Sequence, residues 1–191
     1  MANRKWYGSI SNRIDEGKNY NEDKLIHEGD DITMYYWSDR RCYYVTKVVN
    51  QKRIFVKKYE VVADREQEGG MGHQNWLYFR TVKECNDYLK KYGLGYDEVY
   101  ENSEEEWVYR YNNWYQAFRY NLNTWNKCLE NAKKDCKNPD DEEAVKNLAR
   151  FYMRLSPEEL EKVLSGKEVV KYYKLQKVSF GVKEYYYDWE F

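Results

Sequence analysis

The spacing of apolar residues changes period twice along this chain, and that change restricts the fold more than any other feature. From Asp31 to Asp64, aromatic and β-branched residues interleave with charged ones, which is typical of strands. From Leu122 to Ser165, apolar residues recur at steps of three and four, which places them on one helix face. From Glu168 onward the β-like composition returns. The sequence therefore predicts strands, then helices, then strands again.

The first β region divides into three expected strands. They span Ile32 to Trp37, Arg41 to Val49 and Arg53 to Val62, with polar turn residues between the last two. Alternation is imperfect, because the rings of Tyr43 and Tyr44 are adjacent in the sequence. This pattern indicates strands that are covered partly on both faces, so we expect a small coiled sheet or barrel rather than a flat sheet.

One helix is expected after these strands. A short apolar strand, Trp76 to Phe79, precedes Thr81 and Glu84, whose spacing matches a capping box. Gly93 is the natural end of the helix that this box begins.

A second hairpin is expected farther along the chain. Its strands run from Glu106 to Tyr111 and from Trp114 to Tyr120. Asn112 and Asn113 supply the turn, because asparagine tolerates positive φ better than most residues.

Two longer helices and one short helix are expected between Leu122 and Ser165. Pro139 ends the first helix, and the acidic residues that follow it begin the second, where the helix dipole favours negative charge. Ser156 and Glu159 form a second capping box at the start of the short helix. This block interrupts the β-rich pattern and is expected to fold as an insertion.

These elements define an α+β fold with a mainly antiparallel β body. We expect residues 1–120 to form the β-rich body with one helix, and residues 121–166 to form the helical insertion. Residues 167–191 are expected to return to the body as strands, because sequential elements of a sheet usually end beside earlier ones. These last strands are Val169 to Leu175, Val178 to Val182 and Tyr185 to Trp189.

Composition excludes two simple classes of charged protein. The chain holds 32 Lys plus Arg against 33 Asp plus Glu, so it is neither a uniformly basic nucleic-acid coat nor a strongly acidic mimic. Its 22 tyrosines are unusual, and tyrosine suits both half-buried sheets and contact surfaces. No long apolar segment is present, so no membrane span is expected. We expect a cytoplasmic protein.

Catalytic and metal-binding patterns are not found in the sequence. The cysteines lack a CxxC pair, and His27 and His73, the two histidines, belong to no nucleophile or metal motif. The Gly69 to His73 loop lacks the lysine of a phosphate-binding loop. We therefore expect no enzyme activity, no metal and no cofactor.

A basic hairpin is the first candidate contact surface. Residues 39 to 58 hold seven cations and one acid, interleaved with aromatic rings. Cations can hold phosphates and rings can stack bases, although lysine and arginine also commonly cover the wet face of a strand. The candidate nucleic-acid-binding residues are Arg40, Arg41, Lys52, Arg53, Lys57 and Lys58.

Acidic runs are the second candidate surface. Clustered carboxylates can imitate nucleic-acid phosphates toward a basic partner. The alternative is a solvated connector in one run and ordinary first-turn acids of a helix in the other. The candidate partner-binding residues are Glu104, Glu105, Glu106, Asp140, Asp141 and Glu142.

Three stretches of the sequence together resemble small proteins of phages that infect gut Firmicutes. They are Trp6 to Ile14, Met34 to Tyr44 and Val178 to Phe191. Some proteins of that group look like type II anti-CRISPR proteins, which inhibit Cas9. The resemblance covers the two ends of the chain and does not include the helical insertion.

Two functions are therefore expected, from different classes. The resemblance implies a phage-encoded, non-enzymatic inhibitor in the cytoplasm of the infected host. It would bind a host CRISPR effector nuclease, Cas9 with or without its guide RNA, and block nucleic-acid binding or cleavage. The alternative is a small nucleic-acid-binding module of phage DNA or RNA metabolism that uses the basic aromatic hairpin.

Overall fold

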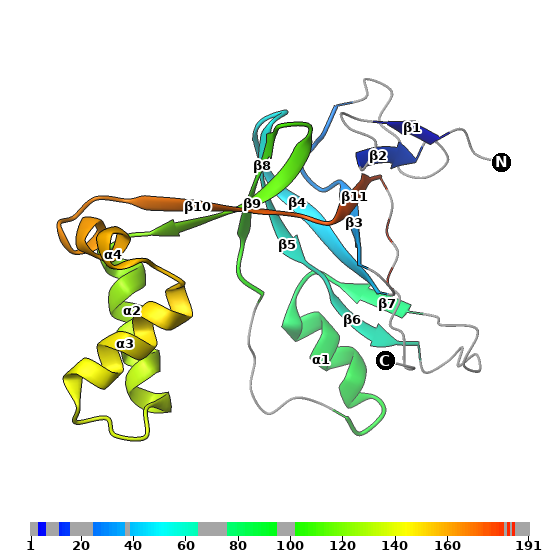
Figure 1. The fold of residues 1–191 in the computed structure, drawn as a ribbon. Helices are drawn as coiled ribbons and strands as arrows, with labels where there is room; N and C mark the ends of the chain where they lie inside the picture. The colour runs from blue at the N-terminus through cyan, green and yellow to red at the C-terminus, as the bar shows by residue number, and fades with distance from the viewer. Residues whose placement is uncertain are drawn as a thin grey trace. The chain divides into compact units, whose positions relative to one another are not determined.

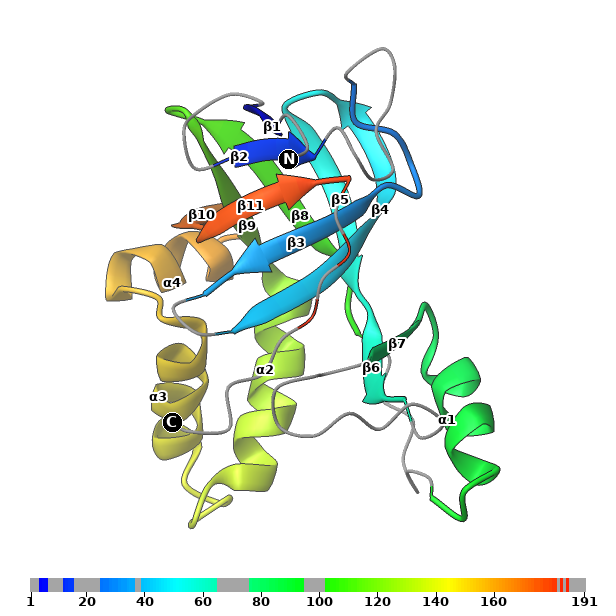
Figure 2. The same ribbon diagram turned by 90° about the vertical axis from the view of Figure 1, so that its right-hand side faces the viewer.

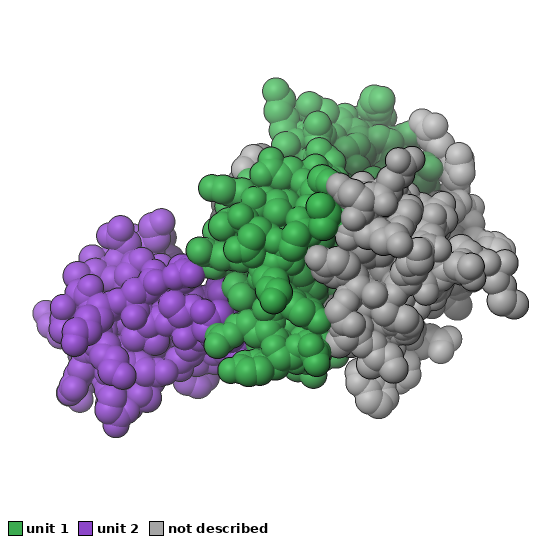
Figure 3. Space-filling view, turned by 90° about the horizontal axis from the view of Figure 1, so that it is seen from above, with its two compact units in different colours: residues 1–116, 174–191 green, residues 117–173 purple. Residues whose placement is uncertain are grey.

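The computed structural model describes residues 4–6, 12–15, 25–36, 39–64, 76–94, 102–181, 183 and 185, with the first two segments described as backbone only. The fold is α+β, as the sequence predicts, with helices and a mostly antiparallel sheet (Figure 1). The chain forms two compact units, which Figure 3 colours separately. Residues 1–116 and 174–191 form unit 1, and residues 117–173 form unit 2.

The main sheet has the strand order β1-β2-β11-β3-β4-β5-β8-β9-β10. Because β1 and β10 lie at its two ends, the sheet is open among the described residues and is not the closed barrel that the sequence also allowed. β11 pairs parallel to β2 and antiparallel to β3, so the C-terminal segment returns beside the N-terminal strands. The strands of this sheet that precede the helical block are β1 (Arg4–Trp6), β2 (Asn12–Asp15), β3 (Asp31–Tyr35), β4 (Arg40–Asn50), β5 (Arg53–Lys58), β8 (Glu105–Arg110) and β9 (Asn113–Tyr120). Those that follow it are β10 (Val169–Lys174) and β11 (Lys177–Phe180).

β4 explains the imperfect alternation of the sequence. Its pairing with β5 shifts register between Val45 and Lys47 and again between Val48 and Asn50. Such bulges increase the local twist and re-aim the side chains that follow. Tyr43 is buried in the core, whereas Tyr44 points to the opposite face and is half-buried. Both faces of β4 are therefore covered in part.

Aromatic rings dominate the core of unit 1. The ring centroid of Trp107 lies 5.0 Å from that of Tyr43, and the Trp114 ring lies 5.4 Å from both Tyr109 and Phe180. Tilted contacts of this kind add about 0.5–1.5 kcal/mol each beyond area burial. The core also contains Ile26, Ile32, Met34, Val45, Ile54, Val56 and Val178.

The strand expected from Arg53 to Val62 is two strands in two different sheets. β5 ends at Lys58, and β6 (Glu60–Ala63) pairs with β7 (Trp76–Phe79) in a separate ribbon. Tyr59 separates them, and its backbone N–H donates to the Cys42 carbonyl at 3.0 Å. Propensity alone cannot show this break, because residues on both sides of Tyr59 favour strands.

Helix α1 (Val82–Lys90) packs against the β6–β7 ribbon (Figure 2). The predicted capping box is confirmed: Thr81 Oγ1 accepts from the Glu84 backbone, and the Glu84 carboxylate accepts from the Thr81 backbone. Cys85 and Leu89 are buried on its packed face.

The β8–β9 hairpin turns one residue earlier than the sequence suggests. Tyr111 and Asn112 form the turn, with φ of 49° and 59°. Two adjacent positive φ values are the geometry of a type I′ turn, which matches the right-handed twist of the strands. Asn113 instead begins β9, and its side-chain amide donates to the Tyr111 carbonyl at 2.9 Å.

Unit 2 contains the predicted helices α2 (Leu122–Asp135), α3 (Glu142–Met153) and α4 (Pro157–Leu164), together with the ends of β9 and β10. The capping box at the start of α4 is confirmed, since Ser156 Oγ accepts from the Glu159 backbone at 3.2 Å. Asp141 caps α3 by accepting from two backbone N–H groups.

A second hydrophobic core lies inside unit 2. Ala132 of α2 and Ala149 of α3 are fully buried, and these small side chains let the two helices approach closely. Val163 of α4 is also fully buried in this core. Cys128 and Cys136 pack against it as free thiols.

The strand expected from Tyr185 to Trp189 lies largely outside the described residues. Val182, the last residue of the strand expected from Val178, also lies outside them. Among the helices that the structure describes, none is both long and apolar enough to cross a membrane.

Candidate nucleic-acid interface

The predicted basic hairpin does not form one continuous cationic face. Arg40 and Arg41 begin β4, where their guanidinium carbons lie 5.6 Å and 4.7 Å from the ring centroids of Tyr35 and Tyr36. Lys52 lies in the exposed turn between β4 and β5. These cations are therefore spread along both ends of the hairpin.

Arg53 is neutralised by the acidic run that was expected to bind a partner. Its Nε lies 2.7 Å from Oε1 of Glu106, whose side chain is 5% exposed. The pairing follows from the sheet order, because β5 and β8 are neighbours and place Phe55 opposite Glu106. This ion pair occupies both side chains, so neither belongs to a free contact surface, and removal of either partner would leave the other charge partly buried and unpaired.

Glu105 also faces inward. Its carboxylate accepts from the indole N–H of Trp107 at 2.9 Å. Burial raises the pKa of this carboxyl group, and the nearby cations Lys58 and Arg41 oppose that shift. Burial, followed by the charge of Arg41, lowers the pKa of Lys58. The two predicted surfaces thus meet at neighbouring strands and partly cancel each other.

The other acidic candidates lie at the surface. Glu104 is exposed and accepts from Thr46 Oγ1 at 2.6 Å. Asp140 and Glu142 are exposed before and at the start of α3, and Glu142 lies 3.3 Å from the Lys146 amine. Asp141 serves as the N-cap of α3, so its carboxylate has a structural role.

Lys57 and Lys58 take part in a different arrangement, at the end of β5. They line a small hollow of about 50 Å³ together with Tyr44, Arg80 and residues at the start of α1. The guanidinium carbon of Arg80 lies 5.0 Å from the Tyr44 ring centroid. This hollow joins the hairpin to a cation that the sequence pattern does not single out.

Arg80 also lines a larger hollow of about 450 Å³. Tyr59, Tyr78 and Phe79 line it together with Lys183. The Lys183 amine lies 5.1 Å from the Tyr59 ring centroid and 5.5 Å from that of Tyr78. Because both hollows share Arg80, we treat them as one surface. The Arg80 groove is defined by Tyr44, Lys57, Lys58, Tyr59, Tyr78, Arg80 and Lys183.

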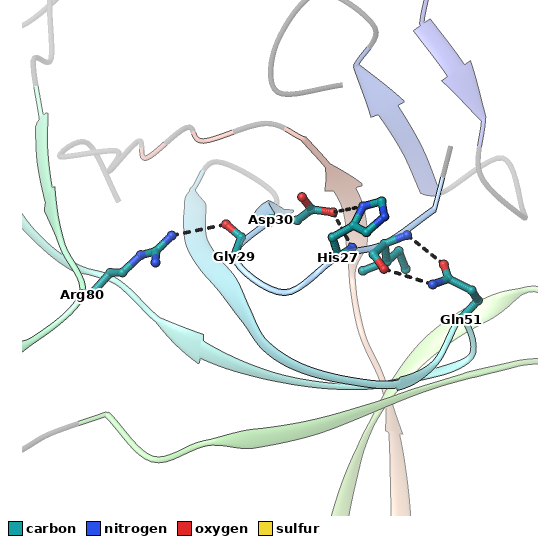
Figure 4. A network of polar contacts seen from close by, with 6 residues as sticks. His27, Gly29, Asp30, Gln51 and Arg80 are labelled. Carbon is teal, nitrogen blue, oxygen red and sulfur yellow. Dashed lines mark hydrogen bonds and ion pairs between the residues drawn. The ribbon is translucent and has the colours of Figure 1, made fainter. Parts of the chain in front are cut away.

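A polar network fixes the centre of this groove. The Tyr59 hydroxyl donates to Asp31 at 2.6 Å, and Asp31 lies 3.7 Å from the Lys183 amine. Arg80 reaches from the end of β7 to the carbonyl of Gly29, at 3.3 Å (Figure 4). Burial and the bond to Asp31 raise the pKa of Tyr59, so its hydroxyl stays neutral.

The segment around His27 forms a turn. Asp30 Oδ2 accepts from the His27 backbone at 2.7 Å, and Gly29 has a φ of 91° in the same turn (Figure 4). Gln51 makes two hydrogen bonds with the backbone of Ile26 and holds the segment against β4. No cluster of metal-ligating side chains occurs among the described residues.

The groove has the chemistry of an anion site with aromatic walls. Its four cations face two lining carboxylates, Glu60 and Glu84, and burial raises the pKa of Glu60. Glu84 is occupied in the α1 capping box. The excess of positive charge can attract phosphates, and the tyrosine rings can contact bases.

Comparison with known proteins gives no relative for this chain. No family model, no curated protein and no solved structure matches it.

Proposed function

We propose that this protein binds nucleic acid through the Arg80 groove and performs no chemistry on it. The observation that carries the proposal is a pair of hollows that share one arginine and are lined by three tyrosines and three lysines. Such a surface resembles the sites by which proteins hold single strands, where cations follow the backbone and rings contact the bases.

Arg80 is the residue on which the groove depends. It lines both hollows and is exposed, and its planar guanidinium can pair with a phosphate or stack on a base. Lys183 is balanced by Asp31, so it contributes less net charge. Lys57 and Lys58 add two cations to the smaller hollow that Arg80 also lines.

Fluorescence anisotropy with labelled single-stranded DNA, single-stranded RNA and duplex DNA tests this proposal. The wild-type protein is expected to bind a single strand at low salt, with affinity that falls as salt rises. Arg80→Ala is expected to weaken binding about tenfold and to reduce the salt slope by about 0.7 for each phosphate that the variant no longer neutralises.

Lys134→Ala, which removes an exposed cation from α2, is the matched control and is expected to bind as the wild type does. Equal weakening in the two variants, or no wild-type binding at low salt, would contradict the proposal.

A second candidate is the phage-encoded inhibitor of a host nuclease such as Cas9. One observation favours it: Asp140 and Glu142 remain at the surface, and the Glu142 side chain is 87% exposed. These carboxylates would face a basic nucleic-acid channel, and the Arg80 groove would contact guide RNA or target DNA within the complex.

Co-purification with Cas9, with and without guide RNA, separates the two candidates. The inhibitor is expected to be retained by the nuclease, and the double variant Asp140→Asn with Glu142→Gln is expected to be retained less. A protein that binds free single strands but is never retained by Cas9 is a nucleic-acid-binding module alone. Asp141 is left unchanged, because its replacement would uncap α3.

A further inference from the structure

Helix α3 has two faces of opposite character. Val145, Ala149 and Met153 point into the core of unit 2. At 100° per residue, the opposite side carries Glu143, Asn147, Arg150 and Phe151. Asp140, just before the N-cap, and Arg154, the C-cap, are exposed at the two ends of the helix. We call these six residues the outer face of α3. These side chains do not belong to the hydrophobic core of the unit.

Phe151 is the exposed ring of this outer face. It is 74% exposed, far more than the other phenylalanine of unit 2. A hollow of about 560 Å³ lies beside it, lined by Arg150, Arg154, Leu155 and Pro157 among others. An exposed ring beside arginines and a hollow has the composition of a protein–protein contact.

The charges of the outer face are ordered along the helix. Asp140 and Glu143 lie at its start, and Arg150 and Arg154 lie at its end. Among the described residues, none of these four side chains takes part in an ion pair, whereas the neighbouring Glu142 pairs with Lys146. The face is therefore negative at one end and positive at the other, with neutral Asn147 between them.

We propose that the outer face of α3 binds the same face of a second copy of this chain, with the two helices antiparallel about a two-fold axis near Asn147. A two-fold axis brings the same patch of both copies together, so the patch must be complementary to itself. Antiparallel pairing places the acids of each copy opposite the arginines of the other. It also brings each Phe151 over the first turn of the facing helix, about 6 Å from the axis along α3.

Other occupants fit this face less well. A nucleic acid or an acidic peptide would be attracted by Arg150 and Arg154 but repelled by Asp140 and Glu143 on the same helix. A basic partner would be attracted by Asp140 and Glu143 but repelled by Arg150 and Arg154. A second copy satisfies both ends at once, and the inference does not depend on the proposed nucleic-acid groove.

Sedimentation velocity of the full chain tests the proposal directly. The wild type is expected to form a dimer with a dissociation constant on the order of 10–100 μM, because a single pair of helices gives a small interface. Raising the salt concentration is expected to weaken it, since exposed charges are screened. A wild type that stays monomeric at about 200 μM would overturn the proposal.

Charge exchange gives a test that only self-pairing passes. The variant Arg150→Glu with Arg154→Glu is acidic at both ends, and the variant Asp140→Arg with Glu143→Arg is basic at both ends. Each variant alone is expected to weaken the dimer by at least about tenfold, because like charges then face each other. An equimolar mixture restores the attraction at both ends and is expected to form a heterodimer.

The matched control is Lys133→Glu with Lys134→Glu, which reverses two exposed charges on α2 and is expected to leave the dimer unchanged. Circular dichroism of each variant shows whether the helices are retained. Folded variants whose mixture remains monomeric would contradict antiparallel pairing, and so would a control that no longer dimerises.

Discussion

At the scale of single residues, the neighbouring strand decides what a charged side chain does. Glu105 and Glu106 belong to one acidic run, yet Glu106 pairs with Arg53 and Glu105 accepts from Trp107. Glu106 is buried and Glu105 is half-buried where β8 pairs with β5. A cluster of carboxylates in the sequence is therefore not by itself a contact surface.

Glu105 leads to a prediction about the pH dependence of stability. Because burial raises its pKa in the folded protein, the unfolded chain releases this proton first as pH rises. The contribution of Glu105 to stability is thus complete below its ordinary pKa and disappears as pH rises through the folded pKa.

In Glu105→Gln, the amide oxygen can still accept from Trp107. This variant is expected to lack the loss of stability that Glu105 causes as pH rises. The free energy of unfolding of the variant, minus that of the wild type, should therefore increase from pH 4 to pH 8. Urea unfolding across that range measures the difference, with Glu130→Gln on the exposed face of α2 as control. A difference that does not change with pH would contradict the assignment.

At the scale of elements, the β8–β9 turn uses an unfavourable residue. Tyr111 has a φ of 49° and is 79% exposed, so neither the backbone nor the core explains a tyrosine there. Type I′ turns favour Asn followed by Gly at these two positions.

The double variant Tyr111→Asn with Asn112→Gly is expected to raise the free energy of unfolding by about 1 kcal/mol, because it relieves the left-handed strain. Urea unfolding measures the change, and Asn138→Gly, in the loop between α2 and α3, controls for a general effect of added glycine. A destabilised hairpin variant would mean that the Tyr111 ring makes a necessary contact.

Helix ends were the most predictable elements of this fold. The capping boxes at Thr81 and Ser156 are local patterns, so the sequence contains all the information that they need. The break at Tyr59 depends on which sheet each strand joins, and no local pattern records that.

The candidate site was less predictable for the same reason. Lys57 and Lys58 were identified from the sequence, but Arg80 and Lys183 come from distant segments that only the folded chain brings to them. One local feature of the sequence could have drawn attention to Arg80: it directly follows an aromatic strand and precedes a capping threonine.

At the scale of the whole molecule, each unit has its own core. Val163 is fully buried in unit 2, and Ile54 is fully buried in unit 1. Val163→Ala is expected to cost about 2 kcal/mol, because it leaves a cavity among the helices.

Hydrogen exchange locates that cost within the molecule. In Val163→Ala, the amides of α2, α3 and α4 are expected to exchange faster while those of β4 and β5 keep their wild-type rates, since each core opens separately. Ile54→Ala is the reciprocal variant and should affect the sheet. Equal acceleration in both units would show a single cooperative structure.

The chain leaves the sheet through β9 and comes back through β10, which is its neighbour. The contacts run in reverse order, as in an ordinary hairpin: Trp114 of β9 contacts Leu175, Phe118 contacts Tyr173, and Arg119 pairs with Glu168. The three helices therefore occupy the place of a turn. A shortened chain with a tight loop there would keep every neighbour in the sheet, so this point is where one module can be exchanged for another without redesigning the rest.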